Sequence, residues 1–244
     1  MRVAVLSDIH GNAQALEAVM NDAIAQNCEH VYCLGDLALA GPQPREVMDY
    51  VMEQENWTVI QGNTDKMIAN YGPEVAEFLE AQYPVMANAL ADDVKILDDL
   101  YGAYLAALPP QLSQVIKKCS VLFVHGSPRA NNEDILPNMH LDEIEEMIDG
   151  TTEKLILCGH THVPCGYQLE TGQTVVNVGS VGRPMTKKPL ACYAVVDFDD
   201  GSFEIRHRFV PYDNQLAAKL MSAREFVGAD RLSDLLLNPS SRHI

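Results

Sequence analysis

Five short blocks of the sequence contain polar residues of the types that bind metal ions. They are Asp8-Ile9-His10-Gly11-Asn12, Gly35-Asp36, Gly62-Asn63-Thr64-Asp65, His125-Gly126 and Gly159-His160-Thr161-His162. A single block has an ordinary structural explanation, because Gly-Asp after a strand is often a turn or a helix cap. Five blocks in succession, each at the end of a predicted strand, instead favour one shared binding site.

The types of these side chains indicate which ions they would hold. The candidate ligands are Asp8, His10, Asp36, Asn63, His125, His160 and His162. Seven ligands are too many for one four-coordinate zinc site, so we expect two divalent ions. Mixed imidazole and carboxylate donors without cysteine suit manganese, iron, zinc, cobalt or nickel better than calcium or magnesium. Manganese is our first choice, with iron, zinc, nickel, cobalt or magnesium as alternatives. A carboxylate that bridges two such ions would hold them at the spacing used for phosphoryl chemistry.

Short apolar runs rich in β-branched residues must position these blocks. The runs are Val3–Leu6, Val31–Leu34, Thr58–Gln61, Val121–Val124, Leu155–Cys158 and Thr174–Val178. Helical patterns at Ala13–Gln26 and Pro44–Glu55 separate the first three, which is typical of an α/β layered domain. The carboxyl ends of strands in such a sheet lie along one edge, so the five blocks are expected to meet there.

Two later segments add an antiparallel part and a helical part. Cys192–Phe198 and Phe203–Val210 flank the turn sequence Asp199-Asp200-Gly201-Ser202, which predicts a hairpin. Apolar residues at helical spacing and no strand pattern predict a helical insertion over about residues 67–118, which could form a lid or only pack. The segment after Asn214 is also helical in pattern.

Composition excludes several classes of protein. The chain has 244 residues, 47% of them hydrophobic, and a formal net charge of −17, which argues against general coating of nucleic acid. No apolar run is long enough to span a membrane, and the first one, Val3–Leu6, is too short for a signal peptide. The scattered cysteines are interpreted as small buried hydrophobic residues. We therefore expect a cytoplasmic protein, and homo-oligomerisation stays open.

The blocks resemble the ordered motifs D-x-H, G-D, G-N, H and G-H-x-H of the calcineurin-like metallophosphoesterase superfamily, and Asn177–Pro184 resembles the N-x-G-S-V-G-x-P stretch of its small prokaryotic members. The resemblance implies a four-layer α/β sandwich with two central mixed β-sheets flanked by helices, formed by one domain over residues 1–244. It implies that Asp8, His10 and His162 hold one ion. It also implies that Asn63, His125 and His160 hold the other, with Asp36 bridging the two.

One position departs from the pattern of several family members. Protein phosphatases and symmetrical dinucleoside polyphosphate hydrolases carry G-N-H-E, whose histidine assists the leaving group, whereas this chain has Gly62-Asn63-Thr64-Asp65. A threonine cannot donate a proton as an imidazolium does near neutral pH. The departure argues against a protein phosphatase and favours a small phosphodiesterase.

The resemblance therefore predicts a phosphodiesterase that hydrolyses a small, nucleotide-like anionic substrate through a hydroxide held between the two ions. Asp36, Asn63 and His125 are assigned to catalysis. Asn12 and Arg183 are the candidates for substrate binding, with loop support slightly favoured for Asn12 and a surface position at a proline turn an equal alternative for Arg183. The alternatives are a phosphomonoesterase, a dinucleoside polyphosphate hydrolase, a metal-free scaffold, and a metal-binding regulator with little turnover. We expect a small phosphorylated substrate as the partner, and we expect no binding of the protein to a membrane.

Overall fold

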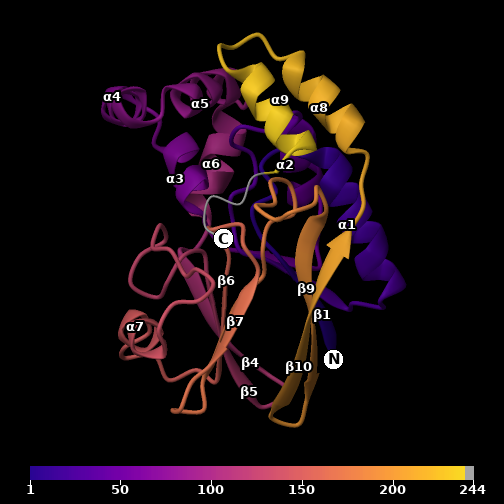
Figure 1. The fold of residues 1–244 in the computed structure, drawn as a ribbon, viewed down its shortest axis with the longest axis vertical. Coiled ribbons are helices and arrows are strands. Elements are labelled where there is room, and N and C mark those ends of the chain that lie inside the picture. Colours follow the sequence, from indigo (N-terminus) through magenta and orange to yellow (C-terminus); the bar gives the residue numbers. More distant parts are fainter. Residues whose placement is uncertain (240–244) are drawn as a thin grey trace.

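A computed structural model describes residues 1–239 of the chain. Two five-stranded mixed sheets stack face to face, with helices on their outer faces (Figure 1). The first sheet has the order β10-β9-β1-β2-β3, and its strands are β1 (Arg2–Leu6), β2 (His30–Cys33), β3 (Trp57–Val59), β9 (Ala191–Asp199) and β10 (Ser202–Val210). The second has the order β4-β5-β6-β8-β7, and its strands are β4 (Gln111–Ile116), β5 (Cys119–Val124), β6 (Leu155–Cys158), β7 (Cys165–Gln168) and β8 (Thr174–Asn177).

The helices fall into three groups. Helices α1 (Ala13–Ala25) and α2 (Pro44–Met52) follow the first two strands, and α8 (Asn214–Ser222) and α9 (Ala229–Leu237) pack on that side of the first sheet. Helices α3 (Asn63–Ala69), α4 (Pro73–Gln82), α5 (Pro84–Ile96) and α6 (Asp99–Ala107) gather at the upper left of Figure 1. Helix α7 (Leu141–Met147) covers the outer face of the second sheet. No helix within residues 1–239 is both long and apolar enough to cross a bilayer.

The period of two along each strand explains the layers. Val3 and Val5 of β1 lie in the core between the sheets, whereas Ala4 and Leu6 pack against the helices of the first sheet. Phe123 likewise faces the other sheet, while its neighbours pack toward α7. Successive side chains of a strand point to opposite faces, so apolar strands without polar alternation are buried on both. The predicted four-layer α/β sandwich is confirmed.

The terminal hairpin and the parallel pairing are as predicted. β9 and β10 pair antiparallel around Asp199–Ser202, and β9 also pairs antiparallel with β1. β1, β2 and β3 are parallel, as are β5, β6 and β8. The parallel strands therefore deliver the loops after them to a common edge.

The predicted helical insertion over residues 67–118 is wrong at its end. Helices occupy residues 63–107, but Gln111–Ile116 forms the edge strand β4, antiparallel to β5. Most β4 side chains face solvent, so the strand lacks the apolar run that marks a buried one. Its hairpin turns at Lys117 and Lys118, both with positive φ, without the glycine or asparagine that usually marks such a turn.

The assignment of residues 1–244 to one domain stays a prediction, because residues 240–244 lie outside the described part.

Candidate metal centre

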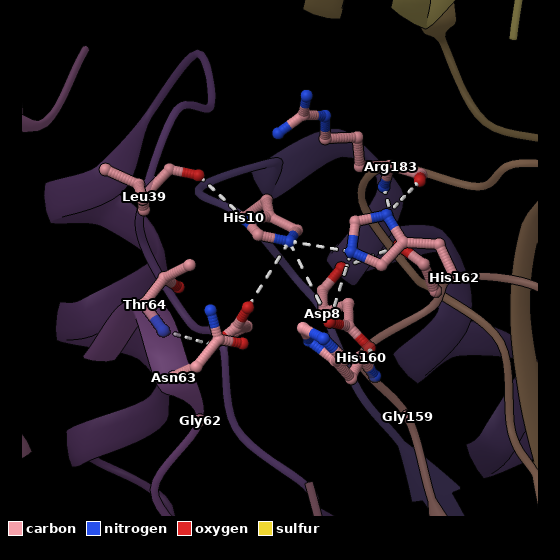
Figure 2. A network of polar contacts seen from close by, with 12 residues as sticks. Asp8, His10, Leu39, Gly62, Asn63, Thr64, Gly159, His160, His162 and Arg183 are labelled. Atoms are coloured by element: carbon pink, nitrogen blue, oxygen red, sulfur yellow. Dashed lines mark hydrogen bonds and ion pairs between the residues drawn. The ribbon is translucent and has the colours of Figure 1, made fainter. Parts of the chain in front are cut away.

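Most of the predicted ligands lie in tight loops that follow the parallel strands of both sheets. Asp8, His10, Asp36, His160 and His162 all have positive φ, between 46° and 67°. This left-handed backbone is uncommon for residues other than glycine and costs about 1–2 kcal/mol per residue. Such strain concentrated at one edge of a fold is typical of functional sites. Figure 2 shows the side chains of Asp8, His10 and His162 pointing toward one another.

Asp8, His10 and His162 form the first compact cluster. The two Nε2 atoms of His10 and His162 are 3.1 Å apart. Asp8 Oδ1 lies 3.2 Å from His162 Nε2 and 3.8 Å from His10 Nε2. All three residues are buried. The structure thus brings together the three residues that the family resemblance assigns to one ion (Figure 2).

Asp8, Asp36 and His125 form the second cluster. His125 Nε2 lies 3.4 Å from Asp36 Oδ1 and 3.9 Å from Asp8 Oδ1. Asn63 joins this side, since its Oδ1 is 2.9 Å from His125 Nε2. The other carboxylate oxygen of Asp36, Oδ2, lies 3.7 Å from His10 Nε2 in the first cluster. Asp36 therefore lies between the two groups of donors, where a bridging carboxylate has to be.

Backbone carbonyls fix the orientation of three histidine rings. The Nδ1 atoms of His10, His125 and His162 lie 2.8, 2.7 and 2.7 Å from the carbonyl oxygens of Leu39, Leu34 and Arg183. A carbonyl oxygen only accepts, so each Nδ1 carries the proton and donates it. In the neutral ring Nε2 then presents its lone pair to the centre of the site. Histidines that ligate metals are held in this way.

The buried polar atoms of the centre also fit divalent ions. Asp8 Oδ1 is buried and has no hydrogen-bond partner among the described residues. Unpartnered buried carboxylate oxygen is costly, and imidazole lone pairs 3.1 Å apart repel unless a proton or a cation lies between them. Oxygen and nitrogen donors of this mixture suit manganese, iron or zinc. The residues thus fit the ions that the motifs imply.

Contacts between carboxylates and imidazoles shift the pKa values of Asp8, Asp36 and His125. Burial would raise the pKa of Asp8, but His162 and His125 outweigh it and lower the pKa to about 2. His125 also holds the pKa of Asp36 far below its usual range, against the opposing effect of burial. Burial lowers the pKa of His125, yet the carboxylates of Asp36 and Asp8 raise it to about 10. Either a proton on His125 or a cation bound at its Nε2 would balance the negative charges of Asp36 and Asp8.

Asp65 positions the loops that carry Asp36 and Asn63. Its buried carboxylate accepts hydrogen bonds from the backbone amides of Asp36, Leu37 and Gly62 at 2.8, 2.9 and 2.9 Å. The amide of Thr64 donates to Asp36 Oδ1 at 2.9 Å. A Cβ atom at Gly62 would overlap the Asp36 carboxylate, so only glycine permits this close approach.

Sequence reasoning missed Asp93 of α5, which supports His10 from behind. The amide of Ala40 donates to Asp93 Oδ2 at 2.7 Å, and Arg224 donates to Asp93 Oδ1 at 2.7 Å. The carbonyl of the same Leu39–Ala40 peptide group accepts the proton of His10 Nδ1. Asp93 lies in an ordinary helical stretch next to Asp92, so no motif distinguishes it. Only the fold brings it to the site.

His160 is the predicted ligand that the structure does not place in either compact cluster. Its Nε2 lies 3.2 Å from Asp134 Oδ1, although its ring lies 5.3 Å from that of His125 and its amide donates to Asp8 Oδ2. Asp134 was not predicted, because it lies in an irregular loop without a motif. The role of His160 as a ligand stays a prediction.

The two residues assigned to substrate binding differ in position. Asn12 is fully buried, caps α1 by accepting from the amide of Ala15, and donates to the carbonyl of Gly182. This geometry favours loop support over substrate contact, because both of its polar atoms are used within the fold. Arg183 is partly exposed beside the site, with its Nη1 3.7 Å from Met86 Sδ, and Figure 2 shows its side chain above His10.

Comparisons with known proteins agree with this geometry. The sequence model of the calcineurin-like phosphoesterase superfamily domain matches residues 1–201. The chain is 29% identical over 225 residues to the uncharacterized protein MJ0912 of Methanocaldococcus jannaschii, covering 86% of this chain and 88% of that protein.

Two solved structures match nearly the whole chain. A metallophosphoesterase from Sphaerobacter thermophilus is 25% identical with a TM-score of 0.77, covering 97% of this chain and 98% of that one. The hypothetical protein PH1004 from Pyrococcus horikoshii OT3 is 25% identical with a TM-score of 0.84, covering 98% of each chain. The two clusters described above thus lie on a fold shared over the whole length of these proteins.

Proposed function

Because this chain belongs to the calcineurin-like phosphoesterase superfamily and carries a buried Asp/His cluster, we propose that it is a two-metal phosphodiesterase acting on a small, nucleotide-like anionic substrate. Manganese is the first candidate for both ions. The observation that carries the proposal is the position of Asp36, whose two oxygens face His10 on one side and His125 on the other. The Asp36 carboxylate thus has one oxygen beside the cluster of His10 and the other beside the cluster of His125.

Asp8, His10 and His162 would hold one ion, and Asn63 and His125, joined by His160, would hold the other. When bound, the two ions lower the pKa of water toward neutrality and neutralise charge that develops on the phosphoryl oxygens. Leu34, Leu39 and Arg183 keep the histidine rings oriented through their carbonyls. The side chain of Arg183 is suited to a bidentate contact with a phosphate oxygen pair.

Thr64 favours esters with good leaving groups. It occupies the position at which related enzymes carry the histidine that assists the leaving group. It is buried, and its Oγ1 has no hydrogen-bond partner within residues 1–239. A threonine hydroxyl does not supply a proton near neutral pH. Aryl and similarly activated esters are therefore expected to react faster than alkyl esters.

Charge supports a diester over more highly charged substrates. The chain has a formal net charge of −17, which repels anions at long range. A phosphodiester carries one negative charge near pH 7, whereas a monoester carries close to two and a polyphosphate more. A phosphomonoesterase is the second candidate, since the same donor set would serve either bond.

The proposal includes the partners and the compartment. We place the protein in the cytoplasm, with a small phosphorylated molecule as its partner and without nucleic-acid coating or membrane attachment. The net charge supports the absence of nucleic-acid coating, because such binding requires many Lys and Arg contacts to phosphate.

The test uses two chromogenic esters that share a leaving group. Protein dialysed against Mn²⁺ is assayed with bis(p-nitrophenyl) phosphate and with p-nitrophenyl phosphate, and Asp36→Asn is compared with the exposed control Asp142→Asn. We expect faster diester hydrolysis that Asp36→Asn abolishes and Asp142→Asn leaves intact. Hydrolysis of the monoester alone would overturn the diester preference. Metal binding without hydrolysis of either ester would instead indicate a regulator.

A further inference from the structure

A cavity of about 690 Å³ opens directly beside the metal centre. Asn63 and His160, two of the predicted ligands, line it together with Leu39 and Thr64. Helices α3, α4 and α5, which gather at one end of the molecule in Figure 1, supply one wall. The loop with Asn131, Asn132 and Asp134 supplies another. The volume falls within the range of pockets that enclose small organic ligands.

The helical wall is apolar and partly aromatic. Its side chains are those of Met67, Val75, Phe78, Leu79, Tyr83 and Met86. Phe78 and Tyr83 are 56% and 57% exposed, so the fold itself does not bury them. Exposed aromatic rings that line a concave surface beside a reactive centre are typical of ligand contacts.

The charges of the cavity limit the kind of ligand. Apart from His160, the charged side chains among its lining residues are one cation, Lys66, and one anion, Asp134. Arg183 is not a lining residue, but its Nη1 lies 3.7 Å from Sδ of Met86, which is one. A triphosphate or another polyanion would find too few cations here. A ligand with one phosphate group and a neutral remainder fits this balance.

Asparagine side chains of the lining can recognise polar edges of a ring. Asn131 and Asn132 line the cavity together with Asn70, whose Nδ2 donates to the Lys66 carbonyl, and a side-chain amide can both donate and accept. Paired donors and acceptors match the edges of a nucleobase better than those of a plain hydrocarbon. The combination of an apolar aromatic wall and an amide wall is what a heteroaromatic ring needs.

From these contacts we infer that the cavity binds a nucleobase-sized heteroaromatic ring of the substrate, with Phe78 and Tyr83 as the stacking surface. The inference rests on the proposed function for the position of the phosphate, and it names the substrate class as esters of nucleosides or similar ring-bearing alcohols. Stacking of a base on an aromatic side chain corresponds to about 5- to 150-fold in affinity.

The probes are adenosine 5′-monophosphate and inorganic phosphate, which differ by one ring-bearing group. Their dissociation constants are measured by equilibrium dialysis with the Mn²⁺-loaded protein. We expect the nucleotide to bind the wild type more tightly by at least about fivefold. Phe78→Ala should lose most of that difference, and Phe78→Trp should keep it. Binding of inorganic phosphate should be unchanged by both substitutions.

The matched control is Phe209→Ala, because Phe209 is 49% exposed on β10 and does not line this cavity. Tyr83→Ala provides a second variant if Phe78→Ala does not fold. Equal affinity for both probes in the wild type, or an equal loss in Phe209→Ala, would overturn the inference. Phe78-dependent nucleotide binding without hydrolysis of any ester would leave the cavity assignment standing and remove the proposed function.

Discussion

The carboxylate of Asp93 is connected to the imidazole of His10 through a single peptide group. Asp93 Oδ2 accepts from the Ala40 amide at 2.7 Å, and the Leu39 carbonyl of the same peptide unit accepts from His10 Nδ1 at 2.8 Å. A negative charge on the amide side polarises the peptide and strengthens the hydrogen bond that its carbonyl accepts. Asp93 thereby supports the lone pair that His10 presents to the first cluster.

Substituting Asp93→Asn is therefore expected to weaken metal binding. The asparagine keeps the size and one acceptor oxygen but loses the charge, and loss of such a supporting group typically costs about 10- to 100-fold in metal affinity. Calorimetric titration with Mn²⁺ measures the change. Asp92→Asn is the matched control, since Asp92 also bonds Arg224 but does not contact Ala40. Equal affinities in the two variants would contradict the connection.

The pKa of Asp93 predicts that the stability of the protein depends on pH. Burial raises the pKa of Asp93 from 3.8 to about 6, against the opposing effect of Arg224. The folded state then holds this proton more tightly than the unfolded state, so the contribution of Asp93 to stability falls as the pH rises from about 4 to 6. Urea unfolding of wild type and Asp93→Asn at several pH values isolates this contribution as the difference between the two. A difference that does not change between pH 4 and pH 7 would show that the pKa is not raised.

Replacing Arg183→Ala should reduce catalysis without releasing metal. The backbone carbonyl of Arg183 holds His162, and an alanine retains that carbonyl. The guanidinium is assigned to the substrate phosphate, and hydrogen bonds to charged groups are worth about 1.5–3 kcal/mol. We expect kcat/KM for bis(p-nitrophenyl) phosphate to fall by about tenfold or more, with unchanged metal content. A parallel loss of metal would show that the substitution disturbs the loop instead.

The position of Thr64 predicts how the enzyme responds to its leaving group. Thr64→His would place an imidazole in the lining of the cavity, where the Thr64 hydroxyl has no partner in the described part of the chain. A proton donor is typically worth about 10²- to 10⁴-fold, and poor leaving groups benefit most. The ratio of rates for aryl and alkyl diesters should therefore shrink in Thr64→His. An unchanged ratio with metal still bound would show that this position does not set leaving-group preference.

Sequence motifs located the centre because its ligands follow recognisable strands. Asp8, Asp36 and His125 each come after an apolar β-branched run, and parallel strands bring such loops together whatever the rest of the chain does. The family resemblance given by these blocks is confirmed by the match over residues 1–201.

Residues without a local signal could not be found in the same way. Asp93 and Asp134 are ordinary acidic residues of a helix and a loop, and tertiary packing alone places them near His10 and His160. The edge strand Gln111–Ile116 was missed for a similar reason, because its exposed polar side chains do not form the apolar run that marks a buried strand. The periodicity of apolar residues shows which side chains are buried. It therefore does not identify an exposed strand or a buried polar residue.

The central claim is that the cluster around Asp36 holds two divalent ions, and counting metal by mass spectrometry in matched variants tests it most directly. Wild type, Asp36→Asn and Asn63→Ala are dialysed against Mn²⁺ and then against metal-free buffer. The wild type should retain about two ions per chain, which is the number that a bridged two-metal site holds. Asp36→Asn should lose more metal than Asn63→Ala, because a bridging ligand supports both ions. Full occupancy in Asp36→Asn would contradict the account.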